Sequence, residues 1–546
     1  MRRSSIAAIC SVLAPFALYL AHALFFGDWI VDDAGITFAY ARNVALGFGA
    51  VSQPGMPPVE GFSNPAWMLL LVPFFWLGAF DPVVTPKAIA AVLVLATFVQ
   101  LRRVVGRLLP RPDLAAGLGL WLIAANPSFV IWSCSGLENP LYALLVASST
   151  VAVIGDLEAA HVRRAQVLMI GAIAGLLAIT RPDGVMFALG YPVLLLSAPW
   201  LTPDPRPARA LSRTLVYALG FAAIAGSYFV FRLTYYGEPV PNTFYAKGSQ
   251  MAHFDLARLK EIVRRVWALL WSLGGPGAVL LAGFVAARCT WLAVRRRLGL
   301  PLLGISTFVL LAFALFVLLP ADWMPEGRFA TPLITLFCPF GSALLVAALR
   351  ALPARWLAPT IVAAVLAAGW AFVDFAQRSR AFRADPTISL QSVTEHWALP
   401  YNQLVDEFGL RDASALIPDL GGTLFYCKLR IYDLAYLCDR TIARTLGGKT
   451  YDSNTPENLA RFYDYVFAEI KPTFIRSHSV WTDNSRLFND PRLERDYHLL
   501  YRKLIPPTEW LGPWHVLDYV RKDAVPGDFE VFERRYLEVM PHLRGS

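Results

Sequence analysis

The 546-residue sequence has few charged residues: only 16% are Asp, Glu, Lys or Arg, whereas 56% are hydrophobic. Soluble domains carry about 25% charged residues, so this composition excludes an ordinary soluble protein. Hydrophobic runs of about twenty residues, long enough to cross a bilayer, recur from Ile6 to Phe372 and stop beyond Ala376. The sequence therefore predicts a polytopic α-helical membrane domain over residues 1–376 and a soluble domain over residues 377–546.

Cysteine is scarce: there are six, with no CxxC pair and no metal-ligand spacing. Cys427 and Cys438 lie in the predicted soluble domain, where they either form a disulfide or remain two buried thiols. The Gly421–Gly422 pair forms neither GxGxxG nor a P-loop, so no nucleotide site is indicated. There is no internal repeat and no low-complexity segment. The net charge of +9 is no sign of nucleic-acid binding, because the arginines lie in short loops between spans.

The distribution of arginine predicts which loops face the cytoplasm. Positive residues favour cytoplasmic loops, so the remaining loops face outward. The opening MRRSSIAAICSVLAPFALYLAHALFF is too long for a signal peptide and is interpreted as a retained first helix with its N-terminus inside. The arginine-rich loops are 102–107, 162–164, 206–213, 288–297 and 350–355, and the outward loops are 133–140, 180–184, 235–248 and 321–329.

The number of spans depends on residues 66–104, where DPVVTPK (81–87) separates two apolar runs. Two full spans here would give twelve crossings and a cytoplasmic C-terminal domain. One partial or re-entrant element gives about eleven, and it places the C-terminal domain outside with the polar loops. We expect eleven.

Two adjacent carboxylates, Asp32 and Asp33, directly follow the first span in WIVDDAGITFAYARN. A solvated loop acid is the ordinary interpretation of one carboxylate at this place. Here the pair opens a long loop (27–65) that ends in VEGFSNPAW, and neighbouring like charges separate the two pKa values. That arrangement suits a general base or a cation site.

Four cations lie at the outward ends of spans: Arg181, Arg232, Lys247 and Arg328. A single arginine at such a place often only reaches toward lipid headgroups. Four beside loops rich in Trp, Tyr and Asn indicate a site that binds an anionic donor and stabilises a departing phosphate. Glu138, in GLEN, is expected to cap the following helix or, alternatively, to hold an acceptor hydroxyl.

The C-terminal region predicts an α/β or α+β domain. ALIPDLGGTLFYCKLRIYDLAYL (415–437) indicates a strand, a glycine turn and further short strands, and KPTFIRSHS (471–479) indicates another buried strand. Its tryptophans form either the core of the domain or stacking surfaces for sugar rings: Trp397, Trp481, Trp510 and Trp514.

The order of motifs resembles that of the AftB-type terminal arabinofuranosyltransferases and their relatives in the GT-C superfamily, which use polyprenyl-phosphate sugars. The resemblance covers nearly the whole membrane part and continues into RIYDLAYLCDRTIA (430–443). A shorter C-terminal region and the VEGFSN loop depart from the cell-wall arabinosyltransferases and leave the acceptor open. The matching motifs are DD with TFAYARNVALGFGAV, VEGFSNPAW, SGLEN, TRPDG, YYGEPVPNTFYAK and DWMPEGRF.

The resemblance implies a GT-C fold and a catalytic role for Asp32 and Asp33. Together with the charge argument it assigns Arg181, Arg232, Lys247 and Arg328 to the donor phosphate. No cofactor is required, although a divalent cation at Asp32 and Asp33 is conceivable. Other motif positions are expected to contact substrate: Tyr40, Arg42, Asn43, Glu60, Asn64, Glu138, Tyr245, Asp322 and Trp323.

The function that follows is sugar transfer at the extracytoplasmic face of the inner membrane. The expected donor is a polyprenyl-phosphate sugar, most simply arabinofuranose, and the expected acceptor a cell-envelope glycan or glycoconjugate. The alternatives are mannose or another hexose transferred to lipopolysaccharide or protein, and, from other classes, a flippase for lipid-linked sugars or a non-enzymatic scaffold. A transporter would typically show inverted repeats and broken helices, which the sequence lacks. We expect a monomer in the lipid bilayer that binds no nucleic acid.

Overall fold

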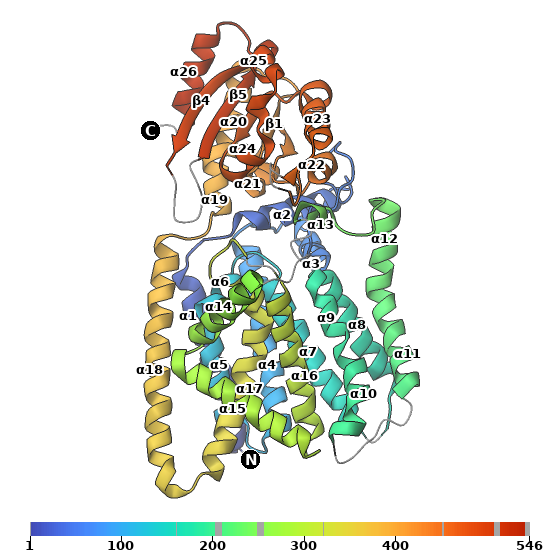
Figure 1. Cartoon of the computed structure of the whole chain (residues 1–546), viewed down its shortest axis with the longest axis vertical. Helices are drawn as coiled ribbons and strands as arrows, with labels where there is room; N and C mark the ends of the chain where they lie inside the picture. Colours follow the sequence, from blue (N-terminus) through green and yellow to red (C-terminus); the bar gives the residue numbers. More distant parts are fainter. Residues whose placement is uncertain are drawn as a thin grey trace.

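The computed structural model describes residues 2–159, 161–202, 210–247, 256–319, 322–449, 453–506 and 514–540. A bundle of long apolar helices carries the N-terminus at one end (Figure 1). At the other end stands a smaller unit of strands and short helices, which we call the cap (residues 385–540).

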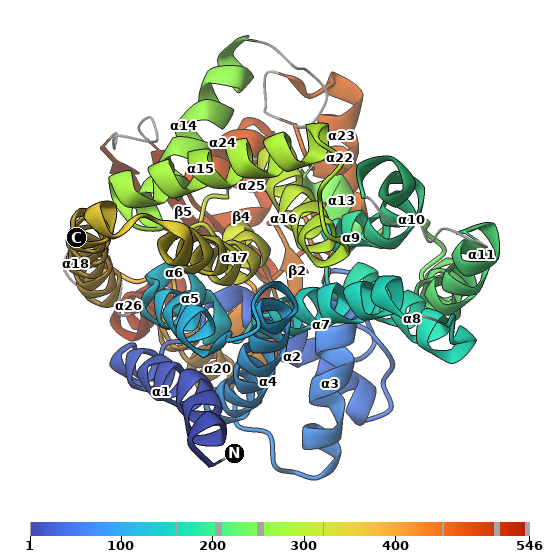
Figure 2. The same ribbon diagram turned by 90° about the horizontal axis from the view of Figure 1, so that it is seen from below.

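Within these described ranges, nine helical segments are long and apolar enough to span a bilayer, and ten if the bent pair α5–α6 counts as one. The chain is therefore a multi-pass membrane protein. Seen from below, most of these helices present their ends to the viewer (Figure 2). The nine are α1 (Arg2–Phe25), α4 (Val84–Leu108), α7 (Asn139–Glu158), η1 to α10 (Pro182–Leu201), α11 to α12 (Ala210–Tyr235), α15 (Gly275–Val294), α16 (Leu300–Leu318), η3 with α17 (Arg328–Ala351) and α18 (Ala354–Ala384).

This number is one or two below the predicted eleven, because α8 (Arg164–Thr180) is shorter than a full span and α5 with α6 counts as a span only as a bent pair. α3 (Pro65–Trp76) has 12 residues and is only about 18 Å long at 1.5 Å per residue. It fits the partial element expected before DPVVTPK. α8 has 17 residues. The bent pair consists of α5 (Asp113–Ala125) and α6 (Pro127–Ser133), which meet at 69°.

Helix α18 has 31 residues and runs through the expected boundary at 376–377 toward the cap. Its Arg378 forms an ion pair with Glu326 and donates a hydrogen bond to Ser128 Oγ at 2.8 Å. Ser128 belongs to α6, and Glu326 lies two residues before Arg328. The long helix therefore fixes the loop that precedes α17.

Helix α2 (Asp32–Ala45) does not cross the bundle but lies between the bundle and the cap (Figure 1). Ala34, Phe38 and Tyr40 on it are fully buried. The Tyr40 hydroxyl donates to Val59 O at 2.6 Å and accepts from the N–H of Gly61 at 3.2 Å, which holds the end of the loop against α2.

The cap contains one five-stranded mixed sheet with strand order β2-β1-β3-β5-β4. β1 pairs in parallel with β2 and β3, whereas β5 runs antiparallel to both β3 and β4. The carboxyl ends of β1, β2 and β3 therefore lie at the same end of the sheet. The strands are β1 (Ser414–Ile417), β2 (Arg430–Asp433), β3 (Phe474–Ser477), β4 (Tyr497–Ile505) and β5 (Trp514–Arg521).

Strands β1, β2 and β3 lie where the sequence predicts strands, but the expected glycine turn is wrong: Gly421 begins helix α21 (Gly421–Tyr426). Cys427 and Cys438 are free thiols in this structure. Short helices surround the sheet: α19 (Leu390–Val393), α20 (Leu399–Phe408), α22 (Arg440–Thr445), α23 (Pro456–Asp464), α24 (Ser479–Ser485), α25 (Pro491–Asp496) and α26 (Phe529–Val539).

Candidate active site

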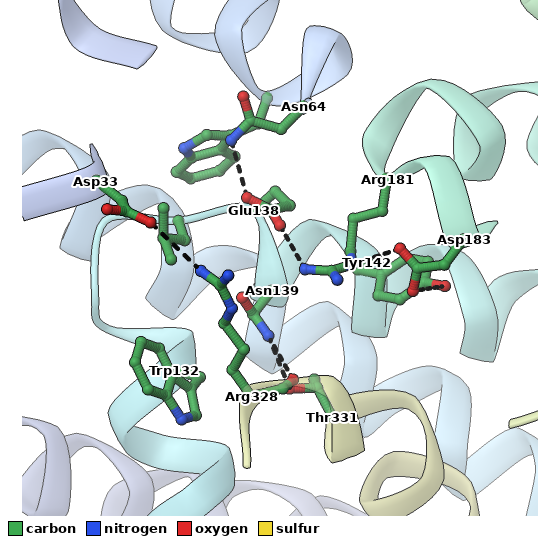
Figure 3. A network of polar contacts seen from close by, with 12 residues as sticks. Asp33, Asn64, Trp132, Glu138, Asn139, Tyr142, Arg181, Asp183, Arg328 and Thr331 are labelled. Carbon is green, nitrogen blue, oxygen red and sulfur yellow. Dashed lines mark hydrogen bonds and ion pairs between the residues drawn. The ribbon is translucent and has the colours of Figure 1, made fainter. Parts of the chain in front are cut away.

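A cluster of charged side chains gathers around the starts of α2, α7 and η3, and Figure 3 shows most of its members. We call Asp33, Glu138, Arg181, Asp183, Asp322 and Arg328 the polar cluster. Arg328 Nη1 lies 3.7 Å from Asp33 Oδ2, and Arg328 Nε lies 2.6 Å from Asp322 Oδ2. The carboxylate pair after the first span and the arginine of DWMPEGRF therefore border the same site.

Glu138 and Arg181 form the second half of the polar cluster. Arg181 donates to Glu138 Oε1 at 2.7 Å and to Asp183 Oδ1 at 2.9 Å, and Asn64 Nδ2 donates to Glu138 Oε2 at 2.8 Å. The guanidinium also lies over the Phe329 ring at 5.0 Å. Arg181 is buried and satisfied by two carboxylates, so it does not simply extend toward lipid headgroups.

Glu138 occupies the position before α7, yet its side chain caps no backbone N–H there. The expectation that it caps the helix is wrong, because Arg181 and Asn64 already occupy its two oxygens. The alternative role, in which Glu138 holds an acceptor hydroxyl, stays a prediction.

The environment shifts the pKa values of the two acids in opposite directions. Burial raises the pKa of Asp33 above its usual value, although Arg328 and Lys247 partly oppose this and 37% of the side chain is exposed. Burial also acts to raise the pKa of Glu138, but Arg181 and the Asn64 amide outweigh it, and the pKa is lowered. Asp33 therefore holds a proton more readily than an ordinary aspartate, whereas Glu138 keeps its charge to lower pH than an ordinary glutamate.

Asp32 faces away from the polar cluster and holds the cap. Its Oδ2 accepts the N–H of Gly421 at 2.9 Å and its Oδ1 accepts that of Gly422 at 2.7 Å. The side chain is buried, which raises its pKa well above the usual value. A Cβ on Gly421 would lie 1.7 Å from Asp32 O, so only glycine fits. The adjacent acids therefore occupy different environments.

Arg42, ten residues further on α2, also binds the cap. Its Nη1 donates to Phe425 O at 2.6 Å, and its guanidinium lies 4.8 Å from the centre of the Phe425 ring. Asn43 donates to Val51 O and Ser52 O within the loop. Arg42 and Asn43, like Tyr40, are thus brought to the loop and the cap interface and not to the polar cluster.

The structure separates the remaining two predicted cations. Lys247 ends α13 (Asn242–Lys247) within electrostatic reach of Arg328, Arg181 and Asp33. Arg232, on α12 (Ser227–Tyr235), instead binds Glu60 through two nitrogens.

Glu60 also accepts from the Tyr228 hydroxyl at 2.7 Å. Arg232 and Glu60 neutralise each other, and across the described residues no ion pair or hydrogen bond connects them to the polar cluster.

Three further predicted substrate contacts can be placed. Asp322 belongs to the polar cluster through Arg328, and Trp323 beside it is 68% exposed. Tyr245 donates to Glu238 at 3.3 Å, and the Arg444 guanidinium lies over its ring. Trp510 lies outside the described residues.

Residues that the sequence analysis missed support this site. Asn139 Nδ2 donates to Arg328 O at 3.1 Å and to Thr331 Oγ1 at 2.8 Å, so it fixes the start of α17. Asp183 was visible in TRPDG but was not assigned. In the described part of the chain, no three His, Cys, Asp or Glu side chains gather to hold a metal ion. Both Asp32 oxygens already accept backbone N–H groups, and a cation at Asp32 and Asp33 stays a prediction.

Fold and site together define a polytopic membrane protein with a charged cluster beneath a cap. No family model matches the chain. Over 230 residues it is 27% identical to the terminal beta-(1->2)-arabinofuranosyltransferase of Mycobacterium tuberculosis, a match that covers 40% of this chain and 35% of that protein. The chain thus spans about a third of the curated relative it matches.

Solved structures match nearly the full chain. ArnT from Cupriavidus metallidurans bound to undecaprenyl phosphate is 13% identical with a TM-score of 0.53, and the match covers 95% of this chain and 99% of ArnT. The archaeal oligosaccharyltransferase AglB from Archaeoglobus fulgidus, in complex with an inhibitory peptide and a dolichol-phosphate, is 12% identical with a TM-score of 0.55, covering 94% of this chain and 75% of AglB. These matches confirm the GT-C fold that the motif order implied.

Proposed function

We propose that the chain is a glycosyltransferase that moves a sugar from a polyprenyl-phosphate donor to a glycan acceptor. The observation that carries the proposal is the placement of Asp33 beside Arg328 and Lys247 at the cap end of a GT-C bundle. A partly hydrated carboxylate next to cations serves both halves of such a transfer. Two of the similar structures hold polyprenyl-type phosphates, namely undecaprenyl phosphate and dolichol-phosphate.

In the proposed reaction, the bond between the anomeric carbon and the phosphate oxygen breaks, and the electron pair leaves with the phosphate. An acceptor hydroxyl forms the new bond to the anomeric carbon, and its proton passes to the Asp33 carboxylate. Positive charge develops at the anomeric carbon, and the nearby carboxylate stabilises it. The products are the extended glycan and the polyprenyl phosphate.

The cations divide into two groups by their partners. Arg328 and Lys247 would bind the donor phosphate, because Asp322 holds Arg328 through Nε while Arg328 Nη1 lies 3.7 Å from Asp33, and Lys247 lies within electrostatic reach of the same acid. Arg181 is held by Glu138 and Asp183, so its proposed role is to fix Glu138 and shape the site. Arg232, neutralised by Glu60, would support the loop that ends at α3.

The sugar we propose is arabinofuranose, supported by the motif order and by the partial match to the mycobacterial arabinofuranosyltransferase. The tendency of arginine-rich loops to face the cytoplasm supports an orientation with the polar cluster and the cap on the extracytoplasmic side of the inner membrane. The lipid donor would then reach the polar cluster from the surrounding bilayer.

The test is a transfer assay on the full chain in lipid nanodiscs. The donor is radiolabelled polyprenyl-phosphate arabinofuranose or, in a parallel arm, polyprenyl-phosphate mannose, and the acceptor is the octyl glycoside of an arabinofuranose disaccharide. Wild type and Asp113→Asn, a matched change of an acid paired with Arg102 far from the polar cluster, should transfer arabinofuranose. Asp33→Asn should not. Transfer by Asp33→Asn at the wild-type rate would refute the mechanism, and transfer of mannose alone would refute the sugar.

A further inference from the structure

Two polar side chains meet just beyond the carboxyl ends of the parallel strands in the cap sheet. Asp419 follows β1 by two residues, and His478 directly follows β3. β1 and β3 are parallel neighbours, with Ala415 opposite Phe474, so both side chains arise at the same end of the sheet. His478 Nε2 lies 3.0 Å from Asp419 Oδ2. In α/β proteins, ligands bind outside the carboxyl ends of parallel strands.

The histidine is left with one ring nitrogen to offer a ligand. In the neutral tautomer that donates from Nε2 to Asp419, Nδ1 carries the lone pair and can accept a hydrogen bond. No described residue hydrogen-bonds to His478 Nδ1. The His478 side chain is 19% exposed, which leaves the ring within reach of a ligand.

Aromatic rings flank this histidine. The Trp481 ring lies 5.2 Å from the His478 ring at an interplanar angle of 82°, and the Trp514 ring lies 6.1 Å away at 50°. Trp514 Nε1 is buried without a hydrogen-bond partner among the described residues. Two aromatic rings thus lie beside a hydrogen-bond donor, Trp514 Nε1, and a hydrogen-bond acceptor, His478 Nδ1, that have no partner among the described residues.

The end of the sheet where these parallel strands finish faces the bundle. Asp419 precedes by two residues the Gly421 and Gly422 N–H groups that bind Asp32, and Asp33 follows Asp32 on α2. Asp419 is close enough to Asp32 to raise its pKa. The histidine pair and the polar cluster therefore lie at the same junction between bundle and cap.

The chemistry favours a neutral hydroxylated ligand over an anion. The nearby cation, Arg476, is bound by both oxygens of Asp518 at 2.6 and 2.8 Å and lies over the Trp397 ring. Asp419 itself would repel a phosphate or carboxylate. A sugar presents hydroxyls for Nδ1 and the indole N–H, and apolar C–H faces for the indole rings.

We propose that Asp419, His478, Trp481 and Trp514 form a sugar-binding subsite for the part of the acceptor glycan that does not react. This inference rests on the proposed function, since it assigns the acceptor of the same site. The terminal sugar lies at Asp33 while the next sugar is held by His478. His478 and the tryptophans are binding residues here and take no part in the chemical step.

The experiment compares octyl arabinofuranoside with the octyl glycoside of the arabinofuranose disaccharide as acceptors of the full chain in nanodiscs. Wild type should show a KM for the disaccharide about tenfold or more below that for the monosaccharide, a difference of about 1.4 kcal/mol. His478→Gln and Trp481→Ala should lose this difference at a similar kcat, and Trp481→Phe should retain most of it. The matched control is His498→Gln, because His498 lies on β4 of the same sheet and stacks on Phe529 of α26.

Binding of the disaccharide, measured by calorimetry on the same nanodiscs without donor, separates this inference from the proposed function. If no transfer occurs but wild type binds the disaccharide tenfold more tightly than Trp481→Ala does, the proposed function fails and the subsite stands. If transfer occurs and the two acceptors have equal KM, the subsite is refuted. A fall in kcat at unchanged KM in His478→Gln and Trp481→Phe would also refute it.

Discussion

At the scale of single residues, two neighbouring carboxylates have separate tasks. Asp33 meets Arg328 in the polar cluster, whereas Asp32 binds two backbone N–H groups of the cap. Successive side chains on an α-helix point about 100° apart at 3.6 residues per turn. The start of α2 at Asp32 therefore directs one acid to the bundle and the other to the cap.

Replacement of each acid should give a different defect. Asp33→Asn should lower the transfer rate by about 10²- to 10⁴-fold, the usual contribution of a general base, without changing the heat stability of the protein. Asp32→Asn should retain the chemistry but destabilise the interface, because hydrogen bonds to a charged group contribute about 1.5–3 kcal/mol.

Transfer assays, together with the fraction surviving heating in detergent, distinguish the two acids. If both variants lost the same fraction of the transfer rate and kept their heat stability, the two acids would not have the separate roles proposed here.

The pH dependence of transfer should report Asp33. Its pKa is raised, and only the carboxylate can accept a proton, so activity should fall as pH decreases through this raised pKa. Asp322 contributes to the rise, and Asp322→Asn should therefore shift the acid limb of kcat/KM toward lower pH.

The control variant Asp113→Asn should not shift the acid limb of the pH profile of kcat/KM. A shift of the Asp322→Asn limb toward higher pH would show that Asp33 does not control it.

At the scale of elements, α2 joins the bundle to the cap through contacts that only small residues permit. Gly35 on α2 lies against Gly421, and a Cβ on Gly35 would stand 2.5 Å from Gly421 O. Arg42 continues the interface by binding the carbonyls at the end of α21. The crossing of α2 and α21 is thus a close backbone contact held by charged hydrogen bonds.

A methyl group at this crossing should separate the two elements. Gly421→Ala would place its Cβ 1.7 Å from Asp32 O, so the interface must open, and we expect at least tenfold loss of transfer with earlier heat inactivation. Gly369→Ala is the matched control, since nothing lies within 4 Å of its Cβ position on α18. Alanine favours a helix over glycine by about 1 kcal/mol. Normal stability and transfer in Gly421→Ala would show that the contact is dispensable.

The sequence predicted the elements better than the contacts between them. Hydropathy gave the spans and the partial helix α3, and motif loops on one side of the membrane gave the meeting of Asp33 with Arg328. Sequence reasoning could not give the partner of Arg232, because a snorkelling cation, a phosphate ligand and an ion pair with Glu60 share the same local pattern. Sequence reasoning also missed the contact of Gly421 with Asp32. A close backbone contact requires a glycine, but a glycine in the sequence does not reveal which residue lies against it.

At the scale of the whole molecule, the bundle and the cap enclose the functional groups from two sides. The N-terminus lies at the end of the bundle remote from the cap (Figure 1). Peripheral helices such as α15 and α18 bury little of their surface in the protein, as expected for helices facing lipid. The two ends of the bundle should accordingly face different compartments.

Reporter fusions test this orientation. Alkaline phosphatase, which is active only outside the cytoplasm, should be active when fused after Met540 and inactive when fused after Arg297, in an arginine-rich loop. Cytoplasmic activity of a β-galactosidase fusion at the same positions should show the reverse pattern. An inactive phosphatase after Met540 would place the cap in the cytoplasm and overturn the proposed compartment.

The contact between Asp32 and the cap also has a consequence for biosynthesis. The two partners are 389 residues apart in the chain, and ribosomes add about 5–20 residues per second. Roughly 20 to 80 s therefore pass between the emergence of Asp32 and that of Gly421. A nascent chain that stalls before this glycine lacks the contact that holds the start of α2 against the cap, so the junction beside the polar cluster forms only late in synthesis.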